Sequence, residues 1–226
     1  MERKIFITSD GSSSIFLPDL DETYHSKHGA IQEAYHVFIR NGLDLFSEGS
    51  KVHILEIGFG TGLNCLITYL ESQRRSLKIL YDGVEAYPLK AEEILQLNYV
   101  KELKADEFPH VFKTMHSVSW EENHMIGADF YLKKRKQFFK DIEDKNRFNL
   151  IYFDAFGANV QPDLWTVDIF KKMYDSLKIN GILVTYSAKG SVRRAMQEVG
   201  FKVERLPGPP GKREMLRGIK NKVKKI

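Results

Sequence analysis

Apolar residues recur with two different periods along this chain of 226 residues, and the change of period predicts its elements. Two short β-prone runs at 5–7 and 15–17 flank Asp10-Gly11, a turn pair that predicts an N-terminal β-hairpin. Apolar side chains at helical spacing then predict a helix from Gly29 to about residue 45, ending near Asn41-Gly42.

From residue 51 the pattern becomes an alternation of strands and helices. Nearly continuous apolar runs at 52–57 and 148–154 are typical of buried parallel strands. The stretch 101–127 predicts only a helix and loops. This βαβα order predicts an α/β fold with a doubly wound, mostly parallel sheet. Further strands are predicted at 79–86, 130–132 and 182–186, and helices at 63–73, 88–99, 162–177 and 190–199.

The end of the chain departs from this alternation. Runs at 201–205 and 213–219 are joined by a turn rich in Pro and Gly at 207–211 rather than by a helix. We therefore expect these two strands to pair antiparallel at one edge of the sheet. Since no linker or internal repeat divides the chain, we expect an N-terminal hairpin and helix extension, 1–50, packed on one core domain, 51–226.

Composition narrows the class of protein. Hydrophobic residues make up 42% and charged residues 28%, as in ordinary soluble globular proteins, and no run approaches the ~18 apolar residues of a membrane span. The N-terminus is too soon polar for a signal peptide, and Cys65, the single cysteine, excludes a cysteine-rich metal site. We expect a cytoplasmic protein without a membrane or metal partner.

Charge gives a weaker indication. A net charge of +4 does not by itself indicate a nucleic-acid partner, but basic residues gather in two runs, 133–136 and 220–226. Each run is consistent with solvated surface charge or with contacts to a phosphate backbone.

Three alternating glycines, Gly58, Gly60 and Gly62, follow the strand at 52–57. Ligands of doubly wound sheets bind beyond the carboxyl ends of the strands, and glycine permits positive φ and close backbone approach. Dinucleotide folds require Gly-x-Gly-x-x-Gly, but Leu63 stands at the last of those positions. The spacing instead suits S-adenosylmethionine, which has no phosphate and carries a cationic amino-acid end that Glu56 can hold. The alternative is a tight turn without a ligand.

Polar residues near these strand ends extend the predicted pocket. Glu85 ends the second strand, where a carboxylate accepts both ribose hydroxyls of a nucleoside; otherwise it is a surface acid before the helix that begins at Pro88. Thr61 and Asn64 are placed to add polar contacts, or else to cap the helix that follows the glycines.

Asp154 forms a second candidate centre. It emerges from a buried apolar strand, where an acid is costly unless it acts chemically or caps the next segment. Methyl transfer requires a nucleophile held in line with the methyl group and a group that accepts the proton of an amine. Asp154 suits both tasks, and Phe156 is placed to stack on a planar substrate. The structural alternative is an Asp154 that only caps.

Several motifs together resemble the MnmC-like methyltransferases, which form the methyltransferase part of the enzyme that makes 5-methylaminomethyl-2-thiouridine in tRNA. The resemblance covers nearly the whole chain, and its leader and ending are more specific than the glycine loop. The motifs are Tyr24–Ala30, Gln32–Ala34, His36–Phe38, Gly58–Asn64, Asp154–Phe156, Pro162–Trp165, Thr185–Gly190, Val192–Arg194, Pro207-Gly208 and Lys212–Met215.

The resemblance implies a Rossmann-like class I S-adenosylmethionine methyltransferase fold over 51–226. It implies Asp154 as the catalytic acid, and a pocket lined by Tyr24, His25, Gly58, Gly60, Glu85 and Asp154. Tyr24 and His25 are alternatively explained by packing between the hairpin and the core.

Three departures from the family pattern qualify this inheritance. Large family members continue into a flavin oxidase domain, so we expect a stand-alone form that receives an aminomethyl substrate from another enzyme. The acid expected after the third strand is replaced near Lys136-Gln137, so Gln137 becomes the candidate acceptor for the adenine amino group. The loop at 157–161 lacks the proline and the Asn-Pro ending that are usual in the family.

These observations predict N-methylation of the aminomethyl group on the wobble uridine of tRNA, with the anticodon region as partner. Basic residues on the same edge of the sheet are expected to meet its phosphates. One alternative is another amine substrate, a small molecule or a protein; another is a noncatalytic module that binds the cofactor or RNA. A nicotinamide oxidoreductase is the weakest alternative. The oligomeric state is not predicted. The expected phosphate contacts are Lys189, Arg193, Arg194, Lys212 and Arg213.

Overall fold

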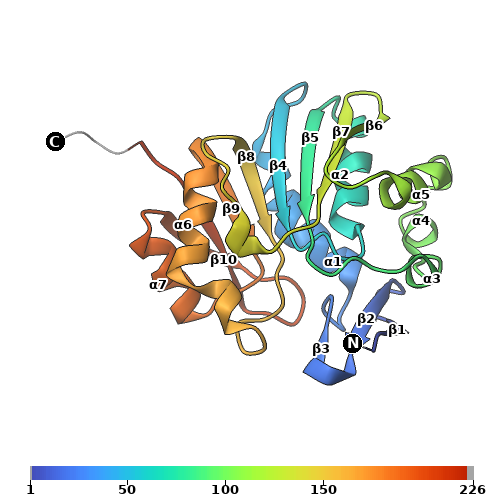
Figure 1. Cartoon of the computed structure of the whole chain (residues 1–226), viewed down its shortest axis with the longest axis horizontal. Helices are drawn as coiled ribbons and strands as arrows, with labels where there is room; N and C mark the ends of the chain where they lie inside the picture. Colours follow the sequence, from blue (N-terminus) through green and yellow to red (C-terminus); the bar gives the residue numbers. More distant parts are fainter. Residues whose placement is uncertain (1, 223–226) are drawn as a thin grey trace.

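An eight-stranded sheet forms the centre of the molecule in a computed structural model that describes residues 2–222 (Figure 1). Its five middle strands pair in parallel, and the outer pairings are antiparallel. The predicted mostly parallel sheet is therefore confirmed, as is the antiparallel pairing of the last two strands. In spatial order the strands are β10 (Lys202–Pro207), β11 (Glu214–Ile219), β9 (Leu177–Thr185), β8 (Phe148–Phe153), β4 (Lys51–Ile57), β5 (Lys78–Val84), β7 (Phe130–Arg135) and β6 (Asn123–Gly127).

Helices pack on both faces of this sheet, as a doubly wound fold requires. Strand side chains alternate between the faces, so Ile54 packs into one apolar core and Leu55 into the other. The first core holds α1 (Ala30–Ala34), the π-helical turn Tyr35–Arg40, α2 (Leu63–Arg74) and α5 (Pro109–Ser117). The second core holds α6 (Val167–Ser176) and α7 (Gly190–Glu198), which lie together at one end of the sheet in Figure 1.

The N-terminal segment forms its own small antiparallel sheet. The predicted hairpin is confirmed by β1 (Lys4–Ile7) and β2 (Ser13–Leu17), to which the unpredicted short strand β3 (Glu22–Thr23) adds. The predicted helix at 29–45 is α1, the π-helical turn and a 3-10 turn at Leu43–Leu45. Its apolar residues pack in the same core as β4. The division of the chain at residue 50 stays a prediction.

The prediction of one helix over 88–99 is wrong. The structure has two short helices there, α3 (Ala91–Ile94) and α4 (Tyr99–Glu102). Asn98 lies between them, and its side chain accepts from the amide of Ser13 at 2.7 Å and donates to the carbonyl of Gly11 at 2.9 Å. Because this residue is bonded to the N-terminal hairpin, the helix is interrupted.

Two further boundaries differ from the sequence prediction. Strand β6 was not predicted, because Ile126 is its one buried residue and its sequence therefore lacks the alternation of apolar and polar residues that marks a strand. The helix expected over 162–177 is a 3-10 turn, Pro162–Trp165, followed by α6. Thr166 caps α6 by accepting from the amide of Ile169, and the next strand already begins at Leu177.

Neither basic run is a simple row of solvated charges. In 133–136 the side chain of Lys134 is buried and donates to the carbonyl of His116 at 2.6 Å, while Arg135 pairs with Asp144 at 2.6 Å. In the other run, Lys220 is buried and donates to the carbonyl of Leu177 at 2.7 Å. Residues 223–226 lie outside the described part of the chain. Buried partners engage two adjacent residues of the first run, so its phosphate interpretation is wrong for Lys134 and Arg135.

Residues 2–222 were compared with the requirements of a membrane-spanning helix and of a metal site. None of the helices described there has both the length and the apolar character that a bilayer span needs. Within the same range, no group of three or more His, Cys, Asp or Glu side chains is arranged to hold a metal ion.

Candidate functional site

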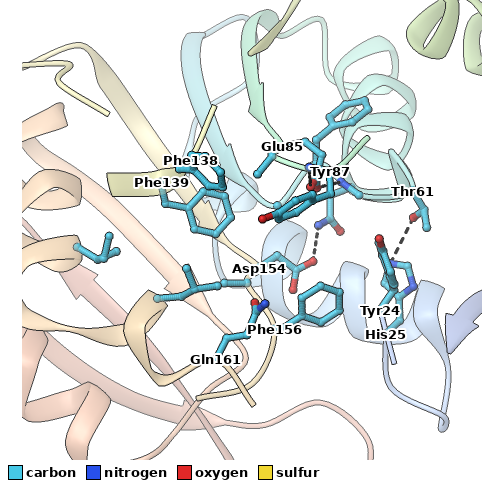
Figure 2. A pocket seen from close by; sticks show the side chains of 18 of the residues that line it. Tyr24, His25, Thr61, Glu85, Tyr87, Phe138, Phe139, Asp154, Phe156 and Gln161 are labelled. Atoms are coloured by element: carbon cyan, nitrogen blue, oxygen red, sulfur yellow. Dashed lines mark hydrogen bonds between the residues drawn. The ribbon is translucent and has the colours of Figure 1, made fainter. Parts of the chain in front are cut away.

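A pocket of about 320 Å³ opens where β4, β5 and β8 end (Figure 2). Figure 2 shows Asp154 near its middle, with Tyr24 and Phe156 on one side and Phe138 and Phe139 on the other. The structure thus brings together residues that the sequence places far apart. Nine of the predicted site residues line the pocket: Tyr24, His25, Gly58, Gly60, Thr61, Asn64, Glu85, Asp154 and Phe156.

The glycine loop has the backbone conformation that its sequence predicts. Gly58, Gly60 and Gly62 have φ values of +91°, +49° and +74°, which side-chain-bearing residues rarely adopt. A Cβ atom on Gly58 would lie 2.6 Å from the backbone oxygen of Asp154, and one on Gly60 would lie 3.2 Å from the ring of Tyr24. The glycines therefore let the loop after β4 approach the loop after β8 and the N-terminal segment.

Glu85 connects the loops that follow β4 and β5. One carboxylate oxygen accepts from the amide of Gly60 at 3.0 Å, and the other accepts from the amide of Tyr87 at 2.8 Å. The side chain is only partly buried and lines the pocket. Its alternative interpretation, an ordinary surface acid, does not describe this arrangement, because both oxygens are engaged with loop amides.

Asn64 joins two buried carboxylates. Its Nδ2 donates to Oε1 of Glu56 and to Oδ2 of Asp154, both at 2.9 Å. Burial raises the pKa of Asp154 to about 7 and raises the pKa of Glu56 well above its usual range. Asn64 opposes both shifts by donating to the charged forms. No side chain caps the start of α2, so capping does not explain Asn64 or Thr61.

The N-terminal segment supplies a third side of the pocket. The ring of Tyr24 meets that of Phe156 edge-on, with 5.0 Å between centroids. His25 lies between Ser14 and Thr61, 3.1 Å from Oγ of the first and 3.4 Å from Oγ1 of the second. Burial lowers the pKa of His25 to about 4 and raises that of Tyr24 to about 12, so both side chains are uncharged at neutral pH.

Eight predicted site residues do not line this pocket, among them Arg194 and Lys212. Glu56 lies beneath the loop as a fully buried partner of Asn64, and Gly62 contacts His116 instead. Gln137 leaves its Nε2 buried without a hydrogen-bond partner among the described residues. Lys189 donates to the side chain of Asn159. The remaining two predicted substrate contacts outside the pocket are Arg193 and Arg213.

Sequence reasoning missed the aromatic residues of the pocket rim. Phe138 and Phe139 directly follow Gln137 and line the pocket where an acceptor was expected. Phe138 is 48% exposed and meets Tyr87, which is 64% exposed, with 6.1 Å between ring centroids. Two large exposed aromatic side chains at a pocket are unusual enough to indicate a ligand. The pair Phe138-Phe139 at a strand end was the available signal.

The charges and orphaned atoms of the site suit S-adenosyl-L-methionine. Three carboxylates line the pocket, Glu85, Asp154 and Asp163, against one ammonium, Lys140, a balance that favours a cationic ligand over a diphosphate. Oε2 of Glu56 and Oδ1 of Asn64 are buried without a partner among residues 2–222. Both atoms are hydrogen-bond acceptors next to the glycine loop, as the cationic amino-acid end of this cofactor requires.

Comparison with solved structures gives matches over most or all of this chain. The chain is 25% identical to MNMC2 from Aquifex aeolicus, with a TM-score of 0.76, over 100% of this chain and 73% of that one. Spermidine synthase from Thermotoga maritima shares the fold at 14% identity, with a TM-score of 0.55 over 94% of this chain and 69% of that one.

Comparison with curated proteins also finds MnmC relatives. The chain is 31% identical over 215 residues to the tRNA 5-methylaminomethyl-2-thiouridine biosynthesis bifunctional protein MnmC of Azoarcus sp. (strain BH72). The protein of the same name from Burkholderia multivorans is 27% identical to this chain over 216 residues. These alignments cover 87% and 89% of this chain but 32% of each relative, so the chain spans about a third of their length.

The predicted resemblance to the MnmC-like methyltransferases and the predicted class I fold are therefore confirmed. Residues 96–221, more than half of the chain, match the family described as S-adenosyl-L-methionine-dependent methyltransferase. The chain belongs to this family of S-adenosyl-L-methionine-dependent methyltransferases.

Proposed function

We propose that the chain methylates the aminomethyl group of the wobble uridine in tRNA, and so converts 5-aminomethyluridine to 5-methylaminomethyluridine. The observation that carries the proposal is Asp154, a half-buried carboxylate at the end of β8 with a pKa raised to about 7, held by Asn64 inside the pocket. Such a group accepts a proton from an amine near neutral pH. The choice of substrate is supported by the curated relatives, which are named for the biosynthesis of 5-methylaminomethyl-2-thiouridine in tRNA.

The residues around the glycine loop are proposed to hold the cofactor. Glu85 would accept from the ribose hydroxyls, exchanging its bonds to Gly60 and Tyr87. The orphaned Oδ1 of Asn64 would accept from the ammonium end, and Glu56 would act on that end from beneath the loop by holding Asn64. Gly58 and Gly60 leave room for the nucleoside because neither has a Cβ atom. Thr61, Tyr24 and His25 would close the pocket over it, whereas Gln137 and Gly62 are retained only as outer supports.

When bound, the cofactor supplies a methyl group activated on a sulfonium sulfur, which becomes a neutral thioether once the methyl group is on the substrate nitrogen. Oδ2 of Asp154 is occupied by Asn64, so Oδ1 is the oxygen free to face the substrate amine. It would orient the nitrogen lone pair and take one N–H proton as the new N–C bond forms, then release it to solvent. Phe156, braced by Tyr24, would stack on the uracil ring.

Basic residues near the end of β9 are proposed to meet the RNA backbone. Lys189 precedes α7, Arg193 lies in its first turn, and Arg213 is exposed in the turn between β10 and β11. An anticodon base is already unpaired, so a pocket that takes a single base costs little unstacking energy. The loop at 157–161 lies beside these residues and contributes Gln161 to the pocket.

Methyl transfer to defined substrates tests the proposal. Purified chain is incubated with labelled cofactor and tRNA carrying 5-aminomethyluridine, the same tRNA lacking it, free nucleoside, or protein amines. We expect transfer only to the first, and a loss of about 100-fold or more in rate in Asp154→Asn with cofactor affinity retained. Asp168→Asn, an exposed acid in the first turn of α6, is the matched control and should keep full rate. Transfer to another amine without RNA would replace tRNA as the substrate.

A further inference from the structure

A second polar cluster lies beside the pocket and has no role in the chemistry proposed so far. Nζ of Lys212, in the turn between β10 and β11, pairs with Oε1 of Glu33 in α1 at 2.6 Å. The side chain of Glu33 is 9% exposed and that of Lys212 is 33% exposed. A charge pair this buried spans 179 positions of the sequence, so it connects two segments that local structure does not bring together.

Each partner of this pair contacts a segment of the pocket. Oε2 of Glu33 accepts from the amide of Ser26 at 2.9 Å, directly after the pocket residues Tyr24 and His25. Nζ of Lys212 lies 3.7 Å from the centre of the Tyr186 ring, a close cation–π contact. The ion pair therefore touches the N-terminal side of the pocket and the end of β9.

Tyr186 continues the contact toward the reacting group. Its hydroxyl donates to the backbone carbonyl of Ala155 at 2.7 Å. Ala155 directly follows Asp154 and also lines the pocket. A continuous path of contacts thus runs from Ser26 through the ion pair and Tyr186 to the peptide next to the carboxylate of Asp154.

The two charges of the pair act in opposite directions on Asp154. The charge of Glu33 raises the pKa of Asp154, and the charge of Lys212 lowers it. The other polar groups around Asp154 are Glu56 from β4, Asn64 from α2, Tyr186 directly after β9, and the pocket residues Glu85, Lys140 and Asp163. Lys212 is the cation whose charge acts on Asp154, whereas Lys140, the other cation of the site, lines the pocket, so the pairing of Lys212 with Glu33 contributes directly to the balance of charge beside Asp154.

We propose that Glu33 and Lys212 are positioning residues for methyl transfer: their ion pair fixes the peptide after Asp154 through Tyr186 and balances the charge beside its carboxylate. The inference rests on the proposed role of Asp154. It also changes the assignment of Lys212, which the sequence predicts as a phosphate contact and which here faces inward to Glu33.

Titration of Asp154 in the full chain without substrate is the decisive measurement. The carboxyl carbon of labelled aspartate is followed by NMR, and Asp154→Asn identifies the signal. We expect Glu33→Gln to lower the midpoint of Asp154 by about 1 pH unit and Lys212→Met to raise it by about 1 unit. The double variant should return it toward the value of the unchanged protein, and Lys212→Arg, which keeps the charge, should leave it within about 0.3 units.

Controls separate this result from unfolding and from the substrate assignment. Glu204→Gln removes a carboxylate on β10 that pairs with Arg217 on β11, and it should leave the midpoint of Asp154 unchanged. If Lys212→Met does not fold, Glu33→Gln still tests the direction in which the midpoint of Asp154 moves, and Lys212→Arg still tests whether the midpoint depends on the charge at position 212. Midpoints that move in the same direction, or not at all, in folded variants would overturn the inference. Since this titration uses no RNA, absence of tRNA methylation would contradict only the proposed substrate.

Where methyl transfer is measurable, its pH profile adds a second readout. The acidic limb of kcat should move with the NMR midpoint, downward in Glu33→Gln and upward in Lys212→Met. The cofactor affinity of both variants should stay within about threefold, because neither residue lines the cofactor end of the pocket. A fall in kcat without a shift of the limb would indicate a merely structural pair and would contradict the proposal.

Discussion

Two walls of the pocket are built by different means. The cofactor wall, Gly58–Asn64 with Glu85, is held by hydrogen bonds that join residues 8 and 25 positions apart. The substrate wall, Asp154–Leu164, is held by contacts that span 31 positions to Tyr186 and 90 positions to Asn64. The ion pair behind it spans 179 positions. The cofactor wall is therefore held partly by contacts that are close in sequence, the substrate wall depends on contacts across the whole chain, and the bond between Asn64 and Asp154 belongs to both.

This difference separates what each wall tolerates. In the cofactor wall the critical property is backbone conformation, because three glycines have positive φ and little space for a Cβ atom. In the substrate wall it is the charge balance around Asp154. Substitutions that alter backbone geometry should therefore affect the first wall most, and substitutions that alter charge should affect the second.

The largest effect is expected from Gly58→Ala. The new Cβ atom would lie 2.6 Å from the backbone oxygen of Asp154, at a φ of +91°. Strain and overpacking together should cost about 3 kcal/mol of folding free energy and lower cofactor affinity by about 100-fold. Chemical unfolding and calorimetric titration with S-adenosyl-L-methionine measure the two effects.

Gly49→Ala is the matched control for this change. Gly49 has a φ of +73°, but no atom lies within 4 Å of the position that its Cβ atom would take. Its cost should be about 1 kcal/mol from backbone strain alone, with cofactor affinity unchanged. Equal losses in the two variants would mean that positive φ, rather than close approach of the two walls, is what the glycine loop provides.

The second effect concerns stability in Asp154→Asn. Folding raises the pKa of Asp154 from 3.8 to about 7, so the folded state binds this proton more tightly than the unfolded state. The unchanged protein therefore loses stability as pH rises from about 4 to about 7, and the neutral asparagine does not. We expect the variant to be more stable by about 2 kcal/mol at pH 8 and nearly equal at pH 4.

Denaturant unfolding at a series of pH values measures this difference. The full linkage would exceed the expected value, but Asp154 is partly open to the pocket, so solvent screens its charge. A stability difference independent of pH would show that ionisation of the Asp154 carboxylate does not destabilise the folded state.

The fold was largely predictable because its signals are local. The runs that became β4 and β8 are mostly apolar, and Thr166 and Gly200 limit their helices by residue type. Asn98 was not predictable, since its side chain interrupts a helix by bonding a hairpin 85 positions earlier. A residue's own propensity does not report such a partner.

The site divides along the same line. Gly58, Gly60, Glu85 and Asp154 were predicted from their positions after strands, and all four line the pocket. Gln137 was expected there by alignment with a family position, yet Phe138 lines the pocket instead, because the chain turns after β7. Phe138, Phe139 and Lys140 all line the pocket after β7 has ended, so a family position on this segment does not fix which side chains face the pocket.

The third effect returns to the cofactor wall with Glu85→Gln. The new amide nitrogen would face one of the two backbone N–H groups that the carboxylate now accepts from, Gly60 and Tyr87. One loop bond and one proposed ribose contact are lost, so cofactor affinity should fall by about 10- to 30-fold. Glu92→Gln, an exposed acid in α3, should leave affinity unchanged. An equally weak Glu85→Gln effect in calorimetry would remove Glu85 from the ribose site.

The smallest effect tests how far the substrate wall extends toward RNA. Lys189 precedes α7 and donates to Asn159 in the loop after Asp154, so its ammonium is only partly available to a phosphate. Lys189→Ala should weaken tRNA binding by about two- to fivefold and reduce the salt dependence of the affinity by about one counterion. Lys51→Ala removes an exposed lysine at the opposite edge of the sheet, where β4 begins, and should change neither quantity. Anisotropy of labelled tRNA over a range of salt concentrations measures both. An unchanged salt dependence in Lys189→Ala would mean that Lys189 bonds only to Asn159 and does not contact a phosphate. The substrate wall would then end at the loop that contains Asn159.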